Sequence, residues 1–304
     1  APMQTNKESD PSVQRGFHED YTMAGKLRGV HAIYGGHSDN GLMQPVVHPE
    51  TGTIIGLTFG QGMHLGYTKF MINTNTNDVT FIDGYLIPVD SKKYKAKEET
   101  SKLIAEYRKQ YPELSEVIAS MKEASMRLYN NESTIGNLLT DIMRKAANSD
   151  IAFLNSGAIR ADLNAGRVTL EQLINVYPFP DTLSIVELTG AEIRKLIEYS
   201  LTLPYGIGQI SGLKIEFDSS KPAMQRLIEV YVGDQALIDS KTYTIATSKY
   251  LAKGGDGYSI FTEGNLIDDS QSMPEALYKG FKELSTIDLP AINRQIDLNL
   301  RSAL

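Results

Sequence analysis

The stretch Ile151-Ala-Phe-Leu-Asn-Ser-Gly-Ala-Ile-Arg160 is the most informative part of this sequence. Its first four residues are apolar and predict a buried strand, which delivers Asn155 into a loop. An Asn amide both donates and accepts hydrogen bonds, and the guanidinium of Arg160 offers planar, paired donors. The same stretch also fits an ordinary strand-to-helix loop in which Arg160 caps a helix end. The residues by themselves leave both interpretations open.

Two later loops carry aromatic rings beside polar groups. They are Pro178-Phe-Pro-Asp181 and Tyr250-Leu-Ala-Lys-Gly-Gly-Asp-Gly-Tyr258. Phe179 and Tyr250 could stack a heterocyclic base, an interaction that contributes ~1–3 kcal/mol per base and tolerates any base. The alternative for an isolated Phe is packing in the core. Rigid proline flanks are an unusual way to hold a core residue, so they favour a binding role for Phe179.

The same two loops carry the carboxylates of Asp181 and Asp256. Asp-Gly is a hairpin-turn signal, which is the alternative interpretation of Asp256. The Gly-Gly pair before Asp256 exceeds what a turn requires and indicates a close approach of the backbone at Gly255 to a ligand. Together the loops suit a base stacked between rings, with a ribose hydrogen-bonded by Asp and Arg.

The rest of the chain mixes strand-like and helix-like segments without strict alternation. Strand composition occurs at 30–34, 53–59, 66–72, 79–82, 183–188, 212–217, 227–232 and 243–247, and helical patterns occur at 103–111, 136–147, 169–174 and from Thr189 onwards. Thr189 followed three residues later by Glu192 predicts a capping box at that last helix. This order predicts an α+β fold or a layered α/β/β/α sandwich.

Composition narrows the function classes. With 304 residues, 41% of them hydrophobic, the chain is large enough for one or two globular domains. A net charge of −7 without a basic face argues against nucleic acid as a partner. No apolar run is long enough to predict a membrane span. There is no cysteine, and all five histidines lie within the first 64 residues, so transition-metal chemistry belongs to the N-terminal part.

In their order and spacing, the loops at 155–160, 178–181 and 250–258 resemble the C-terminal substrate domain of the 5'-nucleotidase family, from about Arg127 to about Phe261. The resemblance implies the α/β/β/α sandwich for residues 115–304. It further implies a nucleoside site in which two rings clamp the base, an amide contacts the base or ribose, and Arg and Asp hold the ribose. The residues that match this site are Asn155, Arg160, Phe179, Asp181, Tyr250, Gly255 and Asp256.

Two features depart from the family pattern. Ser156 and Ala158 stand where the family usually has glycines. The family also tends to carry an Arg on a strand at the position of Tyr129. Arg127 lies two residues earlier, on the same face of a strand, so we expect it to substitute for that Arg.

Tyr34-Gly-Gly-His-Ser-Asp39 resembles the last metal-binding motif of the family's metallophosphatase domain. The resemblance implies two divalent ions (Zn, Mn, Co or Mg), with His37 and Asp39 as the ligands from this chain. The family's other metal motifs include Asp-x-His and Asn-His, and neither occurs in this sequence. We therefore expect residues 1–92 to be the end of a metallophosphatase domain, 93–114 a linking helix and 115–304 the nucleoside-binding domain. We expect this chain alone to be inactive.

The resemblance implies an enzyme, periplasmic or secreted, that hydrolyses nucleoside 5'-phosphates, with adenosine or AMP as the expected ligand. Cleavage of pyrophosphates or 2',3'-cyclic phosphodiesters shares the same scaffold and stays open. The alternative from another class is a non-catalytic nucleoside-binding protein derived from the family.

Overall fold

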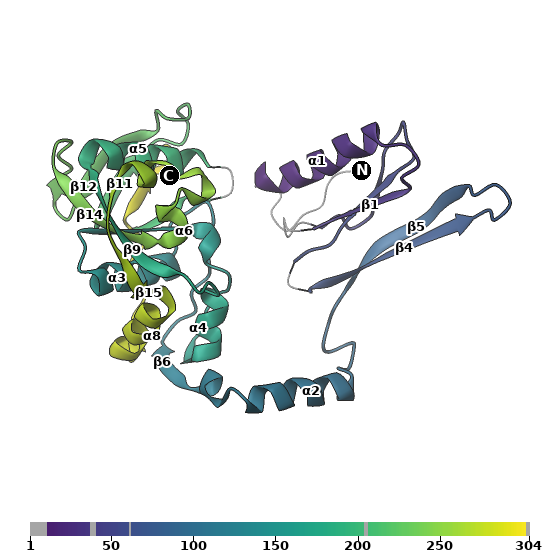
Figure 1. Ribbon diagram of the computed structural model, residues 1–304, viewed down its shortest axis with the longest axis horizontal. Coiled ribbons are helices and arrows are strands. Elements are labelled where there is room, and N and C mark those ends of the chain that lie inside the picture. The colour runs from purple at the N-terminus through teal and green to yellow at the C-terminus, as the bar shows by residue number, and fades with distance from the viewer. Residues whose placement is uncertain (1–10, 37–40, 61, 204–205, 302–304) are drawn as a thin grey trace. The chain divides into compact units, whose positions relative to one another are not determined.

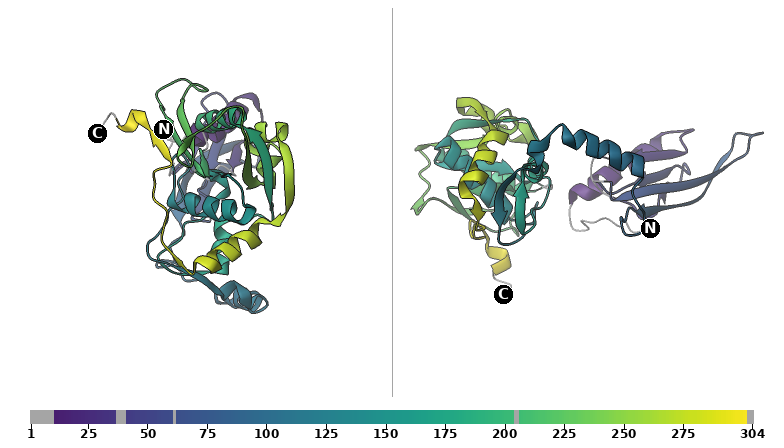
Figure 2. Two further views of the ribbon diagram at one scale, coloured as in Figure 1. Left: turned by 90° about the vertical axis from the view of Figure 1, so that its left-hand side faces the viewer. Right: turned by 90° about the horizontal axis from the view of Figure 1, so that it is seen from below.

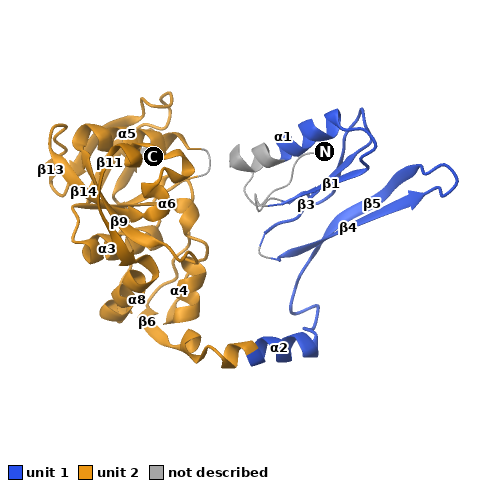
Figure 3. Cartoon of the chain, in the orientation of Figure 1, with its two compact units in different colours: residues 1–106 blue, residues 107–304 orange. Residues whose placement is uncertain are grey.

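The computed structural model describes residues 11–36, 41–60, 62–203 and 206–301, and it divides into two compact units (Figure 3). Unit 1 covers residues 1–106 and unit 2 covers residues 107–304. The division falls inside helix α2, Glu98–Lys109, which lies within the range expected for a linking helix. The assignment of residues 1–92 to the end of a metallophosphatase domain stays a prediction.

Unit 1 contains a small sheet covered by a helix, and a separate hairpin (Figure 1). Its elements are α1 (Pro11–Lys26), β1 (Ala32–Gly35), β2 (Val46–Val47), β3 (Ile54–Leu57), β4 (His64–Ile72) and β5 (Val79–Pro88). The sheet has the order β1-β3-β2, and its core joins Ala24 of α1 to Ile55 and Leu57 of β3. Strands β4 and β5 form the antiparallel hairpin that their strand-like composition predicts.

Unit 2 carries the candidate site and has more elements. The helices are α3 (Thr134–Ala147), α4 (Leu170–Val176), α5 (Gly190–Thr202), α6 (Lys249–Ala252), α7 (Ile260–Glu263), α8 (Met273–Leu284) and α9 (Leu298–Arg301). The strands are β6 (Val117–Met121), β7 (Ile151–Asn155), β8 (Gly166–Thr169), β9 (Thr182–Thr189), β10 (Gly208–Ser211), β11 (Leu213–Phe217), β12 (Leu227–Val232), β13 (Gln235–Ala236), β14 (Thr242–Ser248), β15 (Asn265–Ser272), β16 (Thr286–Ile287) and β17 (Gln295–Asp297).

A five-stranded mixed sheet of order β10-β7-β14-β9-β15 forms the centre of unit 2. Strands β7 and β14 are parallel, while the other neighbours in this sheet are antiparallel. A four-stranded sheet, β13-β12-β11-β17, and a three-stranded sheet, β16-β6-β8, complete the unit. The predicted α+β class is confirmed.

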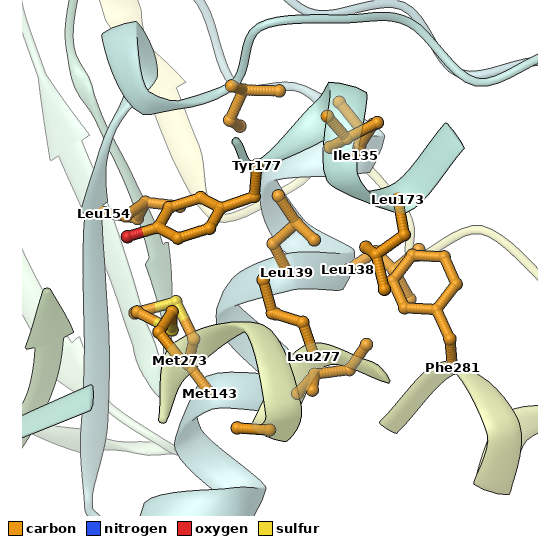
Figure 4. Packing of buried hydrophobic residues seen from close by; sticks show 14 of the residues in the cluster. Ile135, Leu138, Leu139, Met143, Leu154, Leu173, Tyr177, Met273, Leu277 and Phe281 are labelled. Carbon is orange, nitrogen blue, oxygen red and sulfur yellow. The ribbon is translucent and has the colours of Figure 1, made fainter. Parts of the chain in front are cut away.

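Two hydrophobic cores lie on opposite faces of the five-stranded sheet. Figures 1 and 2 show α3 and α8 on one side of it and α5 on the other. The first core packs α3 and α8 against the sheet, and Figure 4 shows Leu138, Leu139 and Met143 of α3 with Leu277 and Phe281 of α8. The second core joins the sheet to α5 and to β11 and β12 of the four-stranded sheet. The unit is therefore layered, with the central sheet buried on both faces.

The strand predicted at 212–217 differs in one respect. Gly212 has a φ of 76°, and the chain leaves the five-stranded sheet there to enter the four-stranded one at Leu213. A Cβ at Gly212 would lie 2.2 Å from the carbonyl oxygen of Asp150. Glycine is required because the backbone both turns and approaches a neighbour closely at this point.

Candidate functional site

The topology of the five-stranded sheet gathers the predicted site residues at one edge. Asn155 ends β7, and Tyr250 follows β14, which is parallel to β7. Strand β9 is antiparallel to β14, and its first residues pair with the last ones of β14, with Leu183 opposite Ser248. Asp181 comes just before β9, so its loop reaches the same edge. Three loops far apart in sequence thus meet because of strand direction alone.

Asp256 is the centre of a hydrogen-bond network. The side-chain amide of Asn155 donates to Asp256 Oδ2 over 2.7 Å, and the hydroxyl of Tyr250 donates to Asp256 Oδ1 over 2.7 Å. The hydrogen bond to the Asp256 carboxylate raises the pKa of Tyr250, with partial burial as a lesser cause. Both carboxylate oxygens are therefore oriented before any ligand arrives.

The backbone around Asp256 forms a short 3₁₀ turn, Gly255–Gly257, after helix α6, so the hairpin interpretation of this segment is wrong. Asp256 has a φ of 51°, in the left-handed region that few non-glycine residues adopt. The hydroxyl of Tyr199 in α5 donates to the Asp256 carbonyl oxygen over 3.0 Å and holds the turn. Sequence reasoning missed Tyr199, since its only signal is a hydroxyl among the apolar residues of α5.

Asn155 is only 9% exposed, and the two polar atoms of its side-chain amide differ in their hydrogen bonding. The amide nitrogen serves Asp256, while Oδ1 is buried without a hydrogen-bond partner among the described residues. Its neighbour Ser156 has a structural task. The Ser156 hydroxyl donates to the carbonyl of Ile207 and accepts from the side chain of Gln209 over 3.0 Å, which anchors the loop after β7 to β10.

The loop carrying Phe179 is joined to helix α6 by Asp181. One oxygen of Asp181 accepts the backbone N–H of Thr182 over 2.9 Å, and the other accepts that of Tyr250 over 3.0 Å. Phe179 is partly buried and packs edge-on against Tyr177, with 5.4 Å between ring centroids. Burial raises the pKa of Tyr177, and the carboxylate of Asp181 adds to the shift. Asp181 thus holds together the two loops that carry Phe179 and Tyr250.

Arg160 lies beside Phe179, and Arg127 contacts Arg160. The guanidinium of Arg160 stands 5.4 Å from the centroid of the Phe179 ring, a cation–π arrangement. Arg127 donates through Nη1 to the carbonyl of Arg160 over 2.6 Å. The strand expected at Arg127 is absent: the segment 122–133 is irregular, so the argument from one strand face is wrong. The Arg127 side chain is nevertheless joined to Arg160, and its guanidinium lies 5.5 Å from the centroid of the Tyr129 ring.

The expected metal ligands, His37 and Asp39, lie outside the described residues. Within the described parts of the chain, no group of three or more His, Cys, Asp or Glu side chains is placed to hold a metal ion. We therefore assign no chemical step to a metal centre. The described helices include none long and apolar enough to cross a bilayer.

Comparison with known proteins agrees with this geometry. A family model of the 5'-nucleotidase C-terminal domain matches residues 115–263, the range that contains the whole network. The trifunctional nucleotide phosphoesterase protein YfkN of Bacillus subtilis is 29% identical over an alignment of 280 residues, covering 84% of this chain and 19% of that protein. The 5'-nucleotidase of Diplobatis ommata is 26% identical over an alignment of 332 residues, covering 92% of this chain and 56% of that protein.

Among solved structures, a 5'-nucleotidase precursor from Thermus thermophilus is similar with a TM-score of 0.82 and 27% identity. The match covers 93% of this chain and 62% of that one. This chain spans less than two thirds of the length of each of these three proteins. Residues 115–263 form a C-terminal domain of the 5'-nucleotidase family.

Proposed function

We propose that unit 2 binds the nucleoside part of a nucleoside 5'-phosphate, with adenosine or AMP as the expected ligand. The observation that carries the proposal is the position of the Asp256 carboxylate, which Asn155 and Tyr250 hold by hydrogen bonds. Tyr250, whose aromatic ring lies next to this carboxylate, is 51% exposed. A carboxylate fixed beside an open ring face suits a ribose joined to a base, because the hydroxyls and the stacking surface lie on adjacent parts of one ligand.

The remaining residues fit the same ligand. The Tyr250 and Phe179 rings offer stacking surfaces for the base, with Gly255 beneath Tyr250. Arg127 uses Nη1 for the carbonyl of Arg160, and the guanidinium of Arg160 lies over the Phe179 ring. We propose that their remaining N–H groups bind ribose or phosphate oxygens. Asn155 and Asp181 contribute mainly by positioning other groups: Asn155 holds the Asp256 carboxylate, and Asp181 holds the backbone of Tyr250.

Calorimetric titration with adenosine tests this proposal. Loss of one stacking ring in Phe179→Ala should weaken binding by about tenfold or more, since stacking contributes ~1–3 kcal/mol per base. Tyr111→Ala is the control for loss of an aromatic ring elsewhere, because Tyr111 is exposed and belongs to none of the three site loops. A folded protein that binds no nucleoside would refute the proposal.

Hydrolysis is the second part of the proposal. We expect the protein, as the cell makes it, to release phosphate from nucleoside 5'-phosphates with the divalent-metal dependence of its family, and to be periplasmic or secreted as family members usually are. Phosphate release from AMP with Mn²⁺, Co²⁺ or Zn²⁺, abolished by EDTA, would support the enzyme. Adenosine binding without any metal-dependent release would favour the non-catalytic alternative.

A further inference from the structure

The hydroxyl of Tyr250 bonds twice to the same residue. The backbone N–H of Asp256 donates to this hydroxyl over 3.1 Å, and the hydroxyl donates to Asp256 Oδ1 over 2.7 Å. A backbone N–H can only donate and a carboxylate can only accept, so the direction of both hydrogen bonds is fixed. The hydroxyl proton is therefore committed to the carboxylate.

The ring of Tyr250 packs closely against the backbone of Gly255. A Cβ at Gly255 would lie 2.5 Å from the ring, which shows how closely the ring covers that glycine. The backbone of Tyr250 is tied to Asp181, and the far oxygen of Asp256 is tied to Asn155. Ring and carboxylate consequently form one rigid group rather than two independent side chains.

We propose that the Tyr250 hydroxyl is a positioning group for ribose recognition. It orients the Asp256 carboxylate toward the ribose hydroxyls, and so couples stacking of the base to binding of the sugar. This inference rests on the proposed nucleoside site. A phenylalanine at this position would stack equally well, but it would lack the hydroxyl that donates to Asp256 Oδ1.

Two ligands separate the positioning role from a purely stacking one. Adenosine carries the 2' and 3' hydroxyls of its ribose, and 2',3'-dideoxyadenosine has the same base and 5' hydroxyl without these two. We expect Tyr250→Phe to weaken adenosine by about fivefold, the scale of one charge-assisted hydrogen bond that is partly open to water. Its affinity for dideoxyadenosine should not change, because that ligand makes no use of Asp256.

The experiment is calorimetric titration of the wild type, Tyr250→Phe, Asp256→Asn and the double variant with both nucleosides. If the hydroxyl acts through the carboxylate, Tyr250→Phe should have little further effect in the Asp256→Asn background. Tyr111→Phe removes a hydroxyl from a ring of similar exposure away from the site and should change neither affinity. Thermal unfolding of each variant shows whether it is folded.

Several results would overturn the inference. An equal loss for both nucleosides would assign the hydroxyl to stacking or folding, and no loss for either would show that it does not position Asp256. Tighter adenosine binding by Tyr250→Phe would mean that the hydroxyl competes with the ribose. A wild type that binds neither nucleoside would instead refute the nucleoside site itself, and this inference with it.

Discussion

At the scale of single residues, Asp256 shows how a strained conformation is kept. A left-handed φ on a non-glycine residue costs on the order of 1 kcal/mol or more, and it persists only where the surroundings enforce it. Here Tyr199 holds the carbonyl, while Tyr250 and Asn155 hold the carboxylate. The strain and its supports coincide at the predicted ligand site, as expected of a group that is prepared for binding.

Gly255→Ala adds a single carbon atom and tests whether the position of the Tyr250 ring matters for binding. The added Cβ would overlap the Tyr250 ring, and the half-exposed ring can swing into solvent to avoid it. We expect adenosine binding to weaken by about tenfold, since both the stacking surface and the Tyr250–Asp256 hydrogen bond move. The free energy of unfolding should change by less than about 1 kcal/mol.

Titration calorimetry and urea unfolding measure the two effects. Gly36→Ala is the control, because no atom of the described residues lies within 4 Å of a Cβ there. Unchanged adenosine affinity in Gly255→Ala would show that the packing of the Tyr250 ring on Gly255 does not contribute to binding.

Residues that lie close together in the site differ in how well the sequence alone predicts their roles. Asn155 and Asp256 could be singled out because each stands in a loop beside a predicted strand or glycine pair. Their hydrogen bond could not be derived, since it joins residues 101 positions apart and depends on β7 and β14 being parallel. Tyr199 could not be found at all, because nothing local distinguishes a helix tyrosine that reaches a distant carbonyl.

At the scale of elements, local chemistry was the most predictable. The capping box at α5 is confirmed: Thr189 accepts from the backbone of Glu192, and Glu192 accepts from the backbone N–H of Thr189 over 2.7 Å. All the groups involved lie within four residues, so their spacing is sufficient to predict them. Arg127 is the opposite case, because whether its segment became a strand depended on neighbours far along the chain.

The capping box makes the stability of α5 dependent on pH. Hydrogen bonds from the backbone and hydroxyl of Thr189 hold the pKa of Glu192 below its ordinary value of 4.5. A lowered pKa in the folded state means that this stabilisation is complete above pH 4.5 and is lost as pH falls through the lowered value. Glu192→Gln keeps an acceptor without the charge, so it should be less stable than the wild type at pH 7, by at most about 1 kcal/mol.

Urea unfolding between pH 7 and pH 3 measures this difference, which should shrink toward zero at the acid end. Glu123→Gln, at an exposed glutamate outside any helix, controls for the general effect of removing one charge. A difference between Glu192→Gln and the wild type that stays constant with pH would show that the charge of Glu192 does not contribute.

At the scale of the whole molecule, the chain consists of two units that must be understood separately. The sequence motifs concentrate in unit 2, and there the class of fold and the site loops could be anticipated. The C-terminal third of unit 2 could not, because β15, β16 and β17 complete three different sheets and show no pattern that names their partners. Such pairings are decided by the assembled core rather than by local sequence.

Glu132 links the beginning of unit 2 to its end. Its carboxylate is 4% exposed and accepts the backbone N–H groups of Asn293, Arg294 and Gln295 over 3.2, 2.9 and 3.0 Å. This contact fixes the segment that enters β17, which pairs with β11. The partner residues are more than 160 positions away, so the contact joins segments from opposite ends of unit 2.

Glu132→Ala should therefore destabilise unit 2 by about 3 kcal/mol, since three partly buried backbone N–H groups and the buried side-chain amide of Asn137 lose this acceptor. Hydrogen exchange should rise first at Asn293, Arg294 and Gln295, because these amides lose their acceptor directly. Glu132→Gln keeps one acceptor oxygen but turns an NH₂ group toward other donors, so we expect an intermediate loss. Glu132→Ala could instead unfold at the same urea concentration as the wild type, with the same hydrogen-exchange protection at 293–297. In that case β17 is held by its strand pairing alone, and the buried carboxylate does not stabilise this segment.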